Sequence, residues 1–555
     1  MPLAPAALRR VLFVICDDLA WGDVSRHGNP YVRTPQLDAL AVAGASCTRH
    51  LSGPLCTPAR AALMTGRHPY RTRAIDTYLG RSILDPDEPT LARLFADAGW
   101  RCGLFGKWHL GDTVPSRPHD LGFHETLYHT GGGLRQPANR GNSSYFNATL
   151  QHNGTPVETT GYCADVFTDA AIDFMRRAAD TPWFCYVAFN TPHTPLEIGD
   201  EWVAPLRRDG LPETWAQLYG MVANIDHNVG RLLATLDQLG LADDTLVVFT
   251  SDHGPCPSAN VEGRIRYNAG LRGHKGTMYE GGLRVPCFAR WPRAISAGTM
   301  ISAPTNPIDF LPTLAAAAGL TPSIDRPPDG VNLLPALTQR EPVPARTLCL
   351  QWHRGNLPQR HRNATAVTPR WKWYQSAPDA PAELYHLEND PGETTDVADD
   401  YPDIVDELGD AYDAWFDAVS RTHAASPAEN FAPIRIPVGD PREPAPWLTR
   451  QDWRRPDDAP EGWADDQPGD WLLEIKRAGQ HRLVVEFAPA KTQRFLIIAC
   501  GESRFTLSLP PQESRAFLDE LTLPAGPCTL AVRLQTNTAA TPQGVRFARL
   551  SPIKL

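Results

Sequence analysis

The run Val11-Leu-Phe-Val-Ile15 is typical of a strand that is buried on both faces of a sheet, because every residue in it is apolar. Similar short runs recur at 102–105, 184–188 and 245–249. Stretches with apolar residues at helical spacing lie between and around them, at 35–43, 90–98, 165–178 and 215–239. This alternation predicts an α/β domain with a large mixed, mainly parallel sheet flanked by helices.

Each of these four runs is followed by polar side chains that suit a binding site. They are Asp17 and Asp18, then Lys107 and His109, then His193, then Asp252 and His253. Open α/β sheets bind ligands at the carboxyl ends of their strands, so we expect these side chains to share one site. Asp17 and Asp18 are also compatible with a solvated turn, and Asp252 and His253 with a turn that ends a strand. The position of both pairs directly after buried strands favours the shared site.

The remainder of the chain predicts three further regions beyond the α/β domain at 8–340. Short strands followed by one helix predict a smaller α+β subdomain over 341–425. Residues 426–469 are rich in Pro and Asp, which predicts a linker or an irregular wrap. Strand-length segments between Gly and Pro predict an appended C-terminal β-sandwich over 470–555.

Composition argues against several classes of partner. With 53 basic and 63 acidic residues the net charge is -10, which offers no electrostatic footprint for nucleic acid or an anionic membrane. The longest apolar runs are shorter than the roughly 20 residues of a membrane-spanning helix. The apolar stretch after Arg10 is too short for a secretory signal, so we expect a cytoplasmic protein unless an export signal is missing from the start. The oligomeric state is left open.

The most informative local motif is Leu55-Cys56-Thr57-Pro58-Ala59-Arg60, which continues to Thr65-Gly66. Thr57 as N-cap, Pro58 at the first helical position and Gly66 at the end predict a short helix. Cys56 would then lie at the positive end of that helix, where anions are attracted. A cysteine in front of a helix is, by itself, more often structural than reactive.

The Cys-x-Pro-x-Arg motif with Thr65-Gly66 resembles the signature of the type I, formylglycine-dependent sulfatases, which are arylsulfatase-like members of the alkaline phosphatase superfamily. Residues 99–111 (GWRCGLFGKWHLG) resemble the second signature of that family. Residues 274–286 (HKGTMYEGGLRVP) and 383–393 (ELYHLENDPGE) resemble further blocks. The likeness reaches from Asp17 to about residue 397, and the terminal segment lies outside it.

This resemblance implies that a formylglycine-generating enzyme oxidises Cys56 to formylglycine, an aldehyde that hydrates to a geminal diol. One hydroxyl attacks sulfur and expels the alcohol, and deprotonation of the other then expels sulfate and regenerates the aldehyde. The implied reaction is hydrolysis of a sulfate ester, with a sulfated saccharide or another sulfated small molecule as substrate. An unmodified Cys56 is expected to be nearly inactive.

The resemblance also implies a metal site. Its expected ligands to one divalent cation are Asp17, Asp18, Cys56, Asp252 and His253. Oxygen ligands favour Ca²⁺. His253 stands where many relatives carry Asn, and an imidazole also suits Mn²⁺ or zinc, so the identity of the metal is left open.

Five further residues receive roles by the same resemblance. Arg60 holds the hydrated aldehyde, while Lys107 and Lys275 neutralise the sulfate oxygens. His109 is the base that triggers collapse of the diol, and His193 is the acid that protonates the leaving oxygen.

Two other functions remain open: a phosphonate monoester or phosphodiester hydrolase of the same superfamily, and an inactive relative whose β-domain binds glycans. A basic stretch at 264–275 predicts a solvated loop, with a rim that recognises further anionic groups on the substrate as the alternative.

Overall fold

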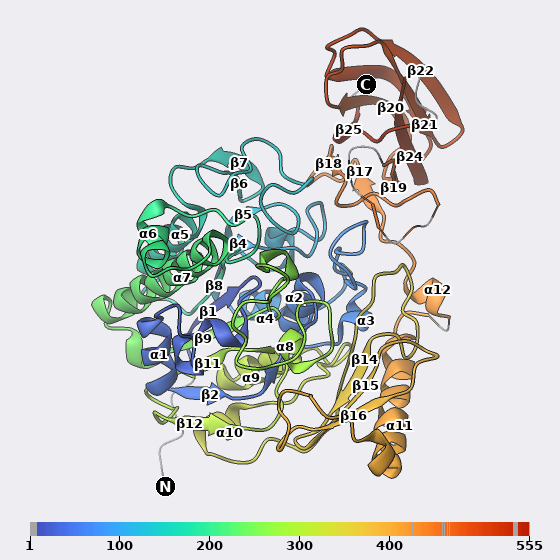
Figure 1. Cartoon of the computed structure of the whole chain (residues 1–555). Coiled ribbons are helices and arrows are strands. Elements are labelled where there is room, and N and C mark those ends of the chain that lie inside the picture. The colour runs from blue at the N-terminus through green and yellow to red at the C-terminus, as the bar shows by residue number, and fades with distance from the viewer. Residues whose placement is uncertain are drawn as a thin grey trace.

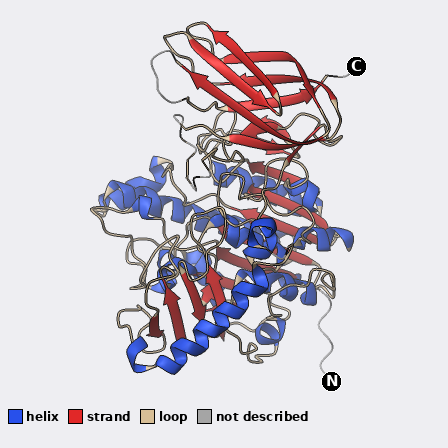
Figure 2. Cartoon of the chain, turned by 90° about the vertical axis from the view of Figure 1, so that its right-hand side faces the viewer, coloured by secondary structure: helices blue, strands red, loops and turns tan. Residues whose placement is uncertain are grey.

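The structure, a computed structural model, describes residues 8–424, 426–457, 459, 461–462, 464, 467–536 and 542–553. A large α/β region and a smaller α+β region form the main body, and a β-sandwich projects from one side of it (Figure 1). Figure 2 shows this sandwich at one end of the molecule, with the long helices in the remainder. The predicted fold class is therefore confirmed.

A ten-stranded mixed sheet forms the centre of the main body, in the order β12-β2-β11-β9-β1-β8-β4-β5-β6-β7. Strands β9, β1, β8, β4 and β5 run parallel to one another. The strands are β1 (Arg10–Cys16), β2 (Ala45–Cys47), β4 (Arg101–Lys107), β5 (Glu125–His129), β6 (Thr149–His152), β7 (Thr155–Glu158), β8 (Trp183–Ala188), β9 (Thr245–Ser251), β11 (Cys287–Arg290) and β12 (Thr299–Ile301). Two short strands, β3 (His50–Leu51) and β10 (Arg284–Val285), pair separately.

Helices cover both faces of this sheet, which explains the uniformly apolar run in β1. Leu12 and Val14 pack into one core with helices α1, α5 and α7, whereas Val11 and Phe13 pack into a second core with α2, α4 and α9. The helices of this region are α1 (Pro35–Val42), α2 (Cys56–Thr65), α3 (Pro69–Thr72), α4 (Leu91–Asp97), α5 (Cys163–Arg177), α6 (Asp200–Arg208), α7 (Glu213–Gln238), α8 (Glu280–Leu283), α9 (Phe310–Ala317) and α10 (Leu334–Thr338). A strand buried on both faces cannot alternate apolar with polar residues.

The smaller region is an antiparallel sheet with one long helix packed on it, as the sequence predicts. Its strands are β13 (Leu348–Gln351), β14 (Ala364–Val367), β15 (Trp371–Gln375) and β16 (Glu383–His386), adjacent in chain order. Helix α11 (Pro402–Val419) contributes Leu408, Tyr412 and Phe416 to a core shared with Trp373 and Leu384 of the sheet.

The β-sandwich consists of a five-stranded sheet, β17-β19-β24-β21-β22, and a four-stranded sheet, β18-β25-β20-β23. Its strands are β17 (Ile436–Val438), β18 (Trp447–Thr449), β19 (Asp470–Ile475), β20 (Gly479–Glu486), β21 (Arg494–Cys500), β22 (Ser503–Leu509), β23 (Arg515–Leu523), β24 (Gly526–Gln535) and β25 (Phe547–Pro552). Helix α12 (Pro427–Asn430) precedes it.

The segment 426–469, expected as a linker or irregular wrap, supplies an edge strand to each sheet of the sandwich. Strand β17 pairs with β19, and β18 pairs with β25. Both strands are only three residues long and β17 contains Pro437, a residue that sheets tolerate at their edges. Strands this short carry too little alternation to be recognised from sequence.

The sandwich also takes part of its core from the α/β region. Leu79 lies in the loop after α3, yet its side chain is buried among the apolar residues of the sandwich, including Trp453 and Trp471. The two regions are therefore joined by a shared apolar contact as well as by the chain. Within the described ranges, no helix is long and apolar enough to cross a membrane.

Candidate active site

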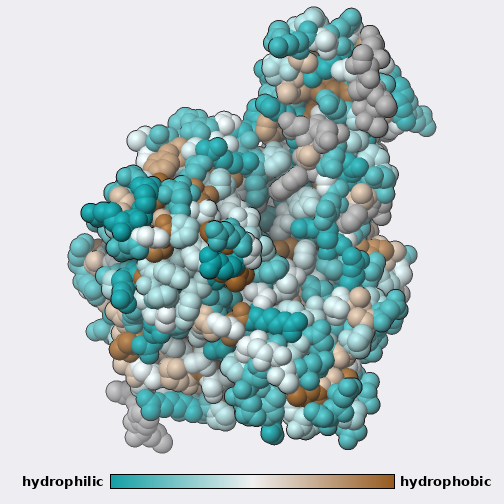
Figure 3. Space-filling view, viewed as in Figure 1, coloured by the Kyte–Doolittle hydropathy of each residue, from teal (hydrophilic) through white to brown (hydrophobic). Residues whose placement is uncertain are grey.

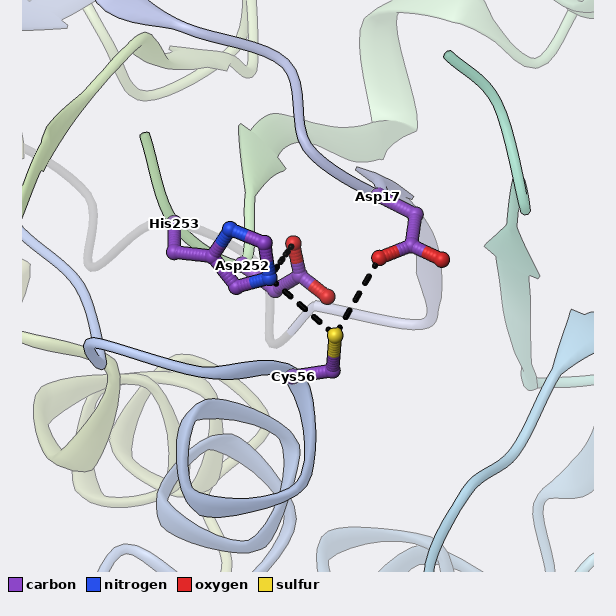
Figure 4. Close-up of side chains that lie close together, drawn as sticks. All are labelled: Asp17, Cys56, Asp252 and His253. Carbon is purple, nitrogen blue, oxygen red and sulfur yellow. Dashed lines mark hydrogen bonds and ion pairs between the residues drawn. The ribbon is translucent and has the colours of Figure 1, made fainter. Parts of the chain in front are cut away.

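The carboxyl ends of four parallel strands bring the predicted site residues together. Cys16 of β1 pairs with Ser251 of β9, so the residues that follow these strands lie side by side. Figure 4 shows Asp17, Asp252 and His253 around the thiol of Cys56. These four side chains are almost completely buried. Lys107 ends β4, and His193 follows β8.

The local structure around Cys56 differs from the prediction in where the helix begins. Helix α2 begins at Cys56 itself, so Pro58 is its third residue and not its first. Thr57 is not the N-cap, and its hydroxyl donates instead to the carbonyl of His109 at 3.0 Å. Gly66 ends the helix with a positive φ of 68°, as predicted. Cys56 thus occupies the positive end of a buried helix, with Thr57 tying that end to His109.

The donor atoms at this site fit a hard divalent cation. The Nε2 atom of His253 lies 3.1 Å from Cys56 Sγ, 3.3 Å from Asp18 Oδ1 and 3.4 Å from Asp252 Oδ1. Cys56 Sγ is also 3.4 Å from Asp17 Oδ1. Three carboxylates and one imidazole nitrogen within such distances form a typical ligand set for a divalent metal.

One buried oxygen at this site supports the same interpretation. Asp18 Oδ2 has no hydrogen-bond partner among the described residues, although Asp18 is only 1% exposed. A buried carboxylate oxygen without a partner is costly, and a cation would satisfy it. The residues present therefore fit a bound metal ion, without selecting Ca²⁺ over other divalent ions.

Each of the three carboxylates is paired with one lysine or arginine side chain. Lys107 Nζ lies 2.7 Å from Asp17 Oδ2, and Lys275 Nζ lies 2.7 Å from Asp18 Oδ1. The guanidinium group of Arg60 donates to Asp252 Oδ2 at 2.9 and 3.2 Å. Because these pairs balance in formal charge, the charge of a divalent cation would remain available to attract an anionic ester.

The same basic groups change the acidity of Cys56. Burial opposes ionisation of its thiol, but Lys107 and Lys275 outweigh burial and lower the pKa of Cys56 well below its usual value. The electrostatic potential at position 56 therefore favours a bound anion.

His109 is held in the tautomer that a base requires. Its Nε2 atom is 2.8 Å from the carbonyl oxygen of Thr77, so Nε2 carries the proton. Its Nδ1 atom is buried and has no hydrogen-bond partner in the described part of the chain. Burial and the Lys107 ammonium lower the pKa of His109, which keeps the imidazole neutral near pH 7. Its backbone is in the left-handed region, with φ 60°.

His193 lies at the more accessible side of the site. Its Nδ1 atom is 2.5 Å from the carbonyl of Thr194, which leaves Nε2 directed toward Asp18 Oδ2 at 3.9 Å. Its side chain is 12% exposed, so it is more accessible than the buried Lys107. This position suits a group that meets the leaving alcohol.

The structure divides the basic stretch at 264–275 into groups with different environments. Arg264 is exposed and pairs with Glu262. Arg266 is buried and donates to Asp23 and to the carbonyl of Asp18, so it supports the site from behind. The sequence predicted that this stretch forms either a solvated loop or a rim that contacts the substrate, and the buried Arg266 fits neither prediction. No sequence motif pointed to its partner Asp23.

Sequence reasoning also missed two glutamines near His109. Gln451 donates from Nε2 to Thr77 O at 2.6 Å and to Ser82 Oγ at 2.9 Å, so it shares with His109 the carbonyl of Thr77. Gln136 follows the Gly131–Gly133 run beside the site. That glycine run after a strand was a usable signal for Gln136, whereas nothing in the sequence connects Gln451 with Thr77.

The fold and this cluster define a hydrolase of the alkaline phosphatase superfamily. A family model described as Sulfatase matches residues 9–320, and one described as N-sulphoglucosamine sulphohydrolase, C-terminal, matches residues 273–412. The first match covers more than half of the chain, and the chain therefore belongs to the sulfatase family.

Individual relatives agree with this assignment. The chain is 32% identical to steryl-sulfatase of Rattus norvegicus in a match that covers 59% of this chain and 70% of that protein. It is 33% identical to N-acetylgalactosamine-6-sulfatase of Homo sapiens in a match that covers 59% of this chain and 66% of that protein. These relatives are sulfuric ester hydrolases, the class of enzyme to which this chain is assigned.

Solved structures extend the comparison to the fold. The structure of Ps i-CgsB in complex with k-i-k-neocarrahexaose has a TM-score of 0.68 and 28% identity, covering 76% of this chain and 97% of that chain. A phosphonate monoester hydrolase of Agrobacterium radiobacter has a TM-score of 0.54 and 23% identity, covering 74% and 96%. The second likeness concerns the fold alone.

Proposed function

We propose that this protein hydrolyses a sulfate ester on a carbohydrate, using a formylglycine formed from Cys56. The observation that carries this proposal is the position of Cys56 at the buried N-terminus of α2, within 3.4 Å of both Asp17 and His253. An electrophilic or nucleophilic group at position 56 would therefore lie next to both a metal site and two lysines.

The implied groups would supply two elements of the chemistry. Formylglycine, once hydrated, supplies a nucleophilic hydroxyl and a second hydroxyl whose deprotonation releases the product anion. A divalent cation held by Asp17, Asp18, Asp252 and His253 would supply Lewis acidity at the same position.

The residues of the chain would perform the remaining steps. Lys107 and Lys275 provide positive charge for the oxygens of the transferring group, which stabilises the transition state. Arg60, fixed by Asp252, orients the side chain at position 56. His109 accepts a proton at Nδ1, because its Nε2 proton is held by Thr77, and His193 delivers a proton from Nε2 to the leaving oxygen.

The names of relatives support a carbohydrate substrate. They include N-acetylgalactosamine-6-sulfatase at 33% identity and a structure in complex with k-i-k-neocarrahexaose at 28% identity. Steryl-sulfatase is a relative of similar identity and acts, by its name, on a different class of ester. The preference for a sugar therefore needs a direct comparison of substrates.

A phosphonate monoester or phosphodiester hydrolase is the second candidate, and one observation favours it. The imidazole Nε2 of His253 lies among the carboxylates, and a nitrogen ligand is less typical of a calcium site than oxygen. The intact acid-base pair His109 and His193 argues against an inactive glycan-binding relative.

Matched substrates on one preparation would test the proposal. The protein is produced with a formylglycine-generating enzyme, and peptide mass spectrometry verifies that Cys56 has become an aldehyde. We expect kcat/KM for a sulfate ester to exceed that for the matched phosphodiester by at least about tenfold, or roughly 1.4 kcal/mol in transition-state stabilisation. Sulfated saccharides, a sulfated sterol and an aryl sulfate then rank the substrate classes.

Two outcomes would overturn parts of the proposal. A preference for the phosphodiester replaces the sulfatase activity with the second candidate. Full activity in a preparation whose Cys56 is unmodified, or in Cys56→Ala, eliminates the formylglycine mechanism.

A further inference from the structure

A large cleft lies between the α/β region and the β-sandwich. Its volume is about 960 Å³. One wall consists of residues 135–143 and the β6–β7 hairpin, and the other of residues 442–450 and 546–549 around β18 and β25. In Figure 3 the surface is hollowed where the projecting sandwich meets the main body.

The side chains that line this cleft are strongly basic, in contrast to the whole protein. Seven arginines and three carboxylates line it, whereas the chain has a net charge of -10. Four of the arginines form ion pairs with carboxylates, namely Arg117, Arg135, Arg140 and Arg442. A local field of opposite sign to the global charge concentrates anionic ligands at one place. Arginine is the basic residue best suited to oxyanions, because its guanidinium group presents a planar fork of donors.

Two of these arginines, Arg546 and Arg549, form no ion pair among the described residues. Arg549 donates from Nε to the carbonyl of Ala445 and lies over the ring of Trp447 at 5.3 Å. Arg546 is exposed, and its side chain forms no hydrogen bond or ion pair within the described ranges. Arg140 lies over the same Trp447 ring, 3.3 Å from its centroid, and pairs with Glu486. An aromatic ring that holds guanidinium groups reduces the entropy lost when they bind an anion.

One residue of the cleft lining, Gln136, lies close to the candidate active site. Gln136 lines the cleft, and a Cβ atom at Gly132 would lie 2.8 Å from Gln136 Oε1 and 2.7 Å from His109 Cε1. A Cβ atom at Gly133 would lie 3.1 Å from Gln136 Nε2 and 3.7 Å from His193 Nδ1. Gln136 Oε1 is also buried without a hydrogen-bond partner among the residues described. Gln136 therefore belongs both to the lining of the cleft and to the surroundings of the two histidines.

We infer that the cleft binds the continuation of a multiply sulfated oligosaccharide whose terminal ester reacts at Cys56, with Arg546 and Arg549 as sulfate contacts. The substrate class rests on the proposed function, whereas the binding of a polyanion rests on the charge and shape of the cleft. The volume exceeds the needs of a single sulfate group and corresponds to a ligand of several sugar units. Arg546 and Arg549 lie on the sandwich wall, three residues apart in and next to β25, where they can contact sulfate groups of such a chain.

Ligand binding is measured in the variant Cys56→Ala, which lacks the reactive residue, so the result does not depend on catalysis. In that background we compare Arg546→Gln/Arg549→Gln with a control, Arg477→Gln/Arg504→Gln, which removes the same charge from exposed positions that do not line the cleft. Calorimetry measures binding of a sulfated hexasaccharide, an unsulfated hexasaccharide and a single-stranded DNA of similar charge. Thermal unfolding verifies that each variant is folded.

We expect the cleft variant to bind the sulfated hexasaccharide at least about tenfold more weakly, with a shallower dependence on salt, because two charge-assisted contacts are lost. The control variant should bind like Cys56→Ala. Equal binding by both double variants, or tighter binding of DNA than of the sulfated sugar, overturns the inference.

Turnover supplies the second readout. In the matured enzyme, kcat/KM for the hexasaccharide divided by kcat/KM for a small aryl sulfate should fall about tenfold in the cleft variant and stay constant in the control. An unchanged ratio overturns the inference. If no sulfate ester is hydrolysed at all, the proposed function fails, while arginine-dependent binding to Cys56→Ala still supports the polyanion cleft.

Discussion

Replacement of Arg60 by Met would test the charge balance of the buried site. Arg60 donates to Asp252 Oδ2 at 2.9 and 3.2 Å, and both side chains are at most 1% exposed. Removal of one partner from a buried ion pair leaves an uncompensated charge and costs about 3–5 kcal/mol. In a domain of this size each kcal/mol corresponds to roughly 2 °C, so Tm should fall by about 6–10 °C.

The double variant Arg60→Met/Asp252→Asn isolates the interaction. Each single substitution leaves one buried charge unpaired, whereas the double substitution removes both charges. We expect the double variant to lose less stability than the two single losses combined, by at least about 2 kcal/mol. Thermal unfolding in the presence of a chelator, followed by tryptophan fluorescence, measures all four proteins without bound metal.

Added metal and an exposed ion pair provide two controls. Added divalent cation should restore stability to Arg60→Met, in which Asp252 remains as a ligand, and should restore less to the double variant. Arg207→Met removes an exposed ion pair with Glu213 at 2.8 Å and should change Tm little. Additivity of the Arg60 and Asp252 losses within about 0.5 kcal/mol would refute the reasoning that the pair is coupled through burial.

Three further predictions concern the contact between the sandwich and the α/β region. Leu79→Ala should cost about 2–5 kcal/mol, measured by Tm, because Leu79 is buried in the core of the sandwich. Gln451→Met removes a donor from the Thr77 carbonyl that orients His109, so kcat for a small aryl sulfate should fall by about tenfold with KM nearly constant; an equal fall in KM would indicate a different role. Burial and then a nearby carboxylate raise the pKa of Asp452 well above its usual value, so the native state binds a proton that the unfolded state has released. Stability is therefore lost as pH rises above the unfolded pKa of about 3.9, and Asp452→Asn should raise Tm at pH 8 but leave it unchanged near pH 3.

Much of the main sheet was predictable because local pattern and burial coincide there. The apolar run from Val11 to Ile15 divides its side chains between two cores, and a strand covered by helices on both faces requires such a run. The three-residue strands β17 and β18 were not predictable. They are short edge strands whose pairing partners lie 35 residues or more along the chain, so long-range pairing determines them.

The sequence was sufficient to predict the members of the candidate site, namely Asp17 and Asp18 after one strand, Asp252 and His253 after another, and the Cys-x-Pro-x-Arg motif at Cys56. Only the tertiary structure decided which cation neutralises which carboxylate: Arg60 pairs with Asp252, 192 positions away, and Lys275 with Asp18, 257 positions away. The physical reason is that a local motif sets the backbone conformation and the type of side chain, whereas ion pairs, the Gln451 contact to Thr77 and the basic cleft depend on how distant segments pack.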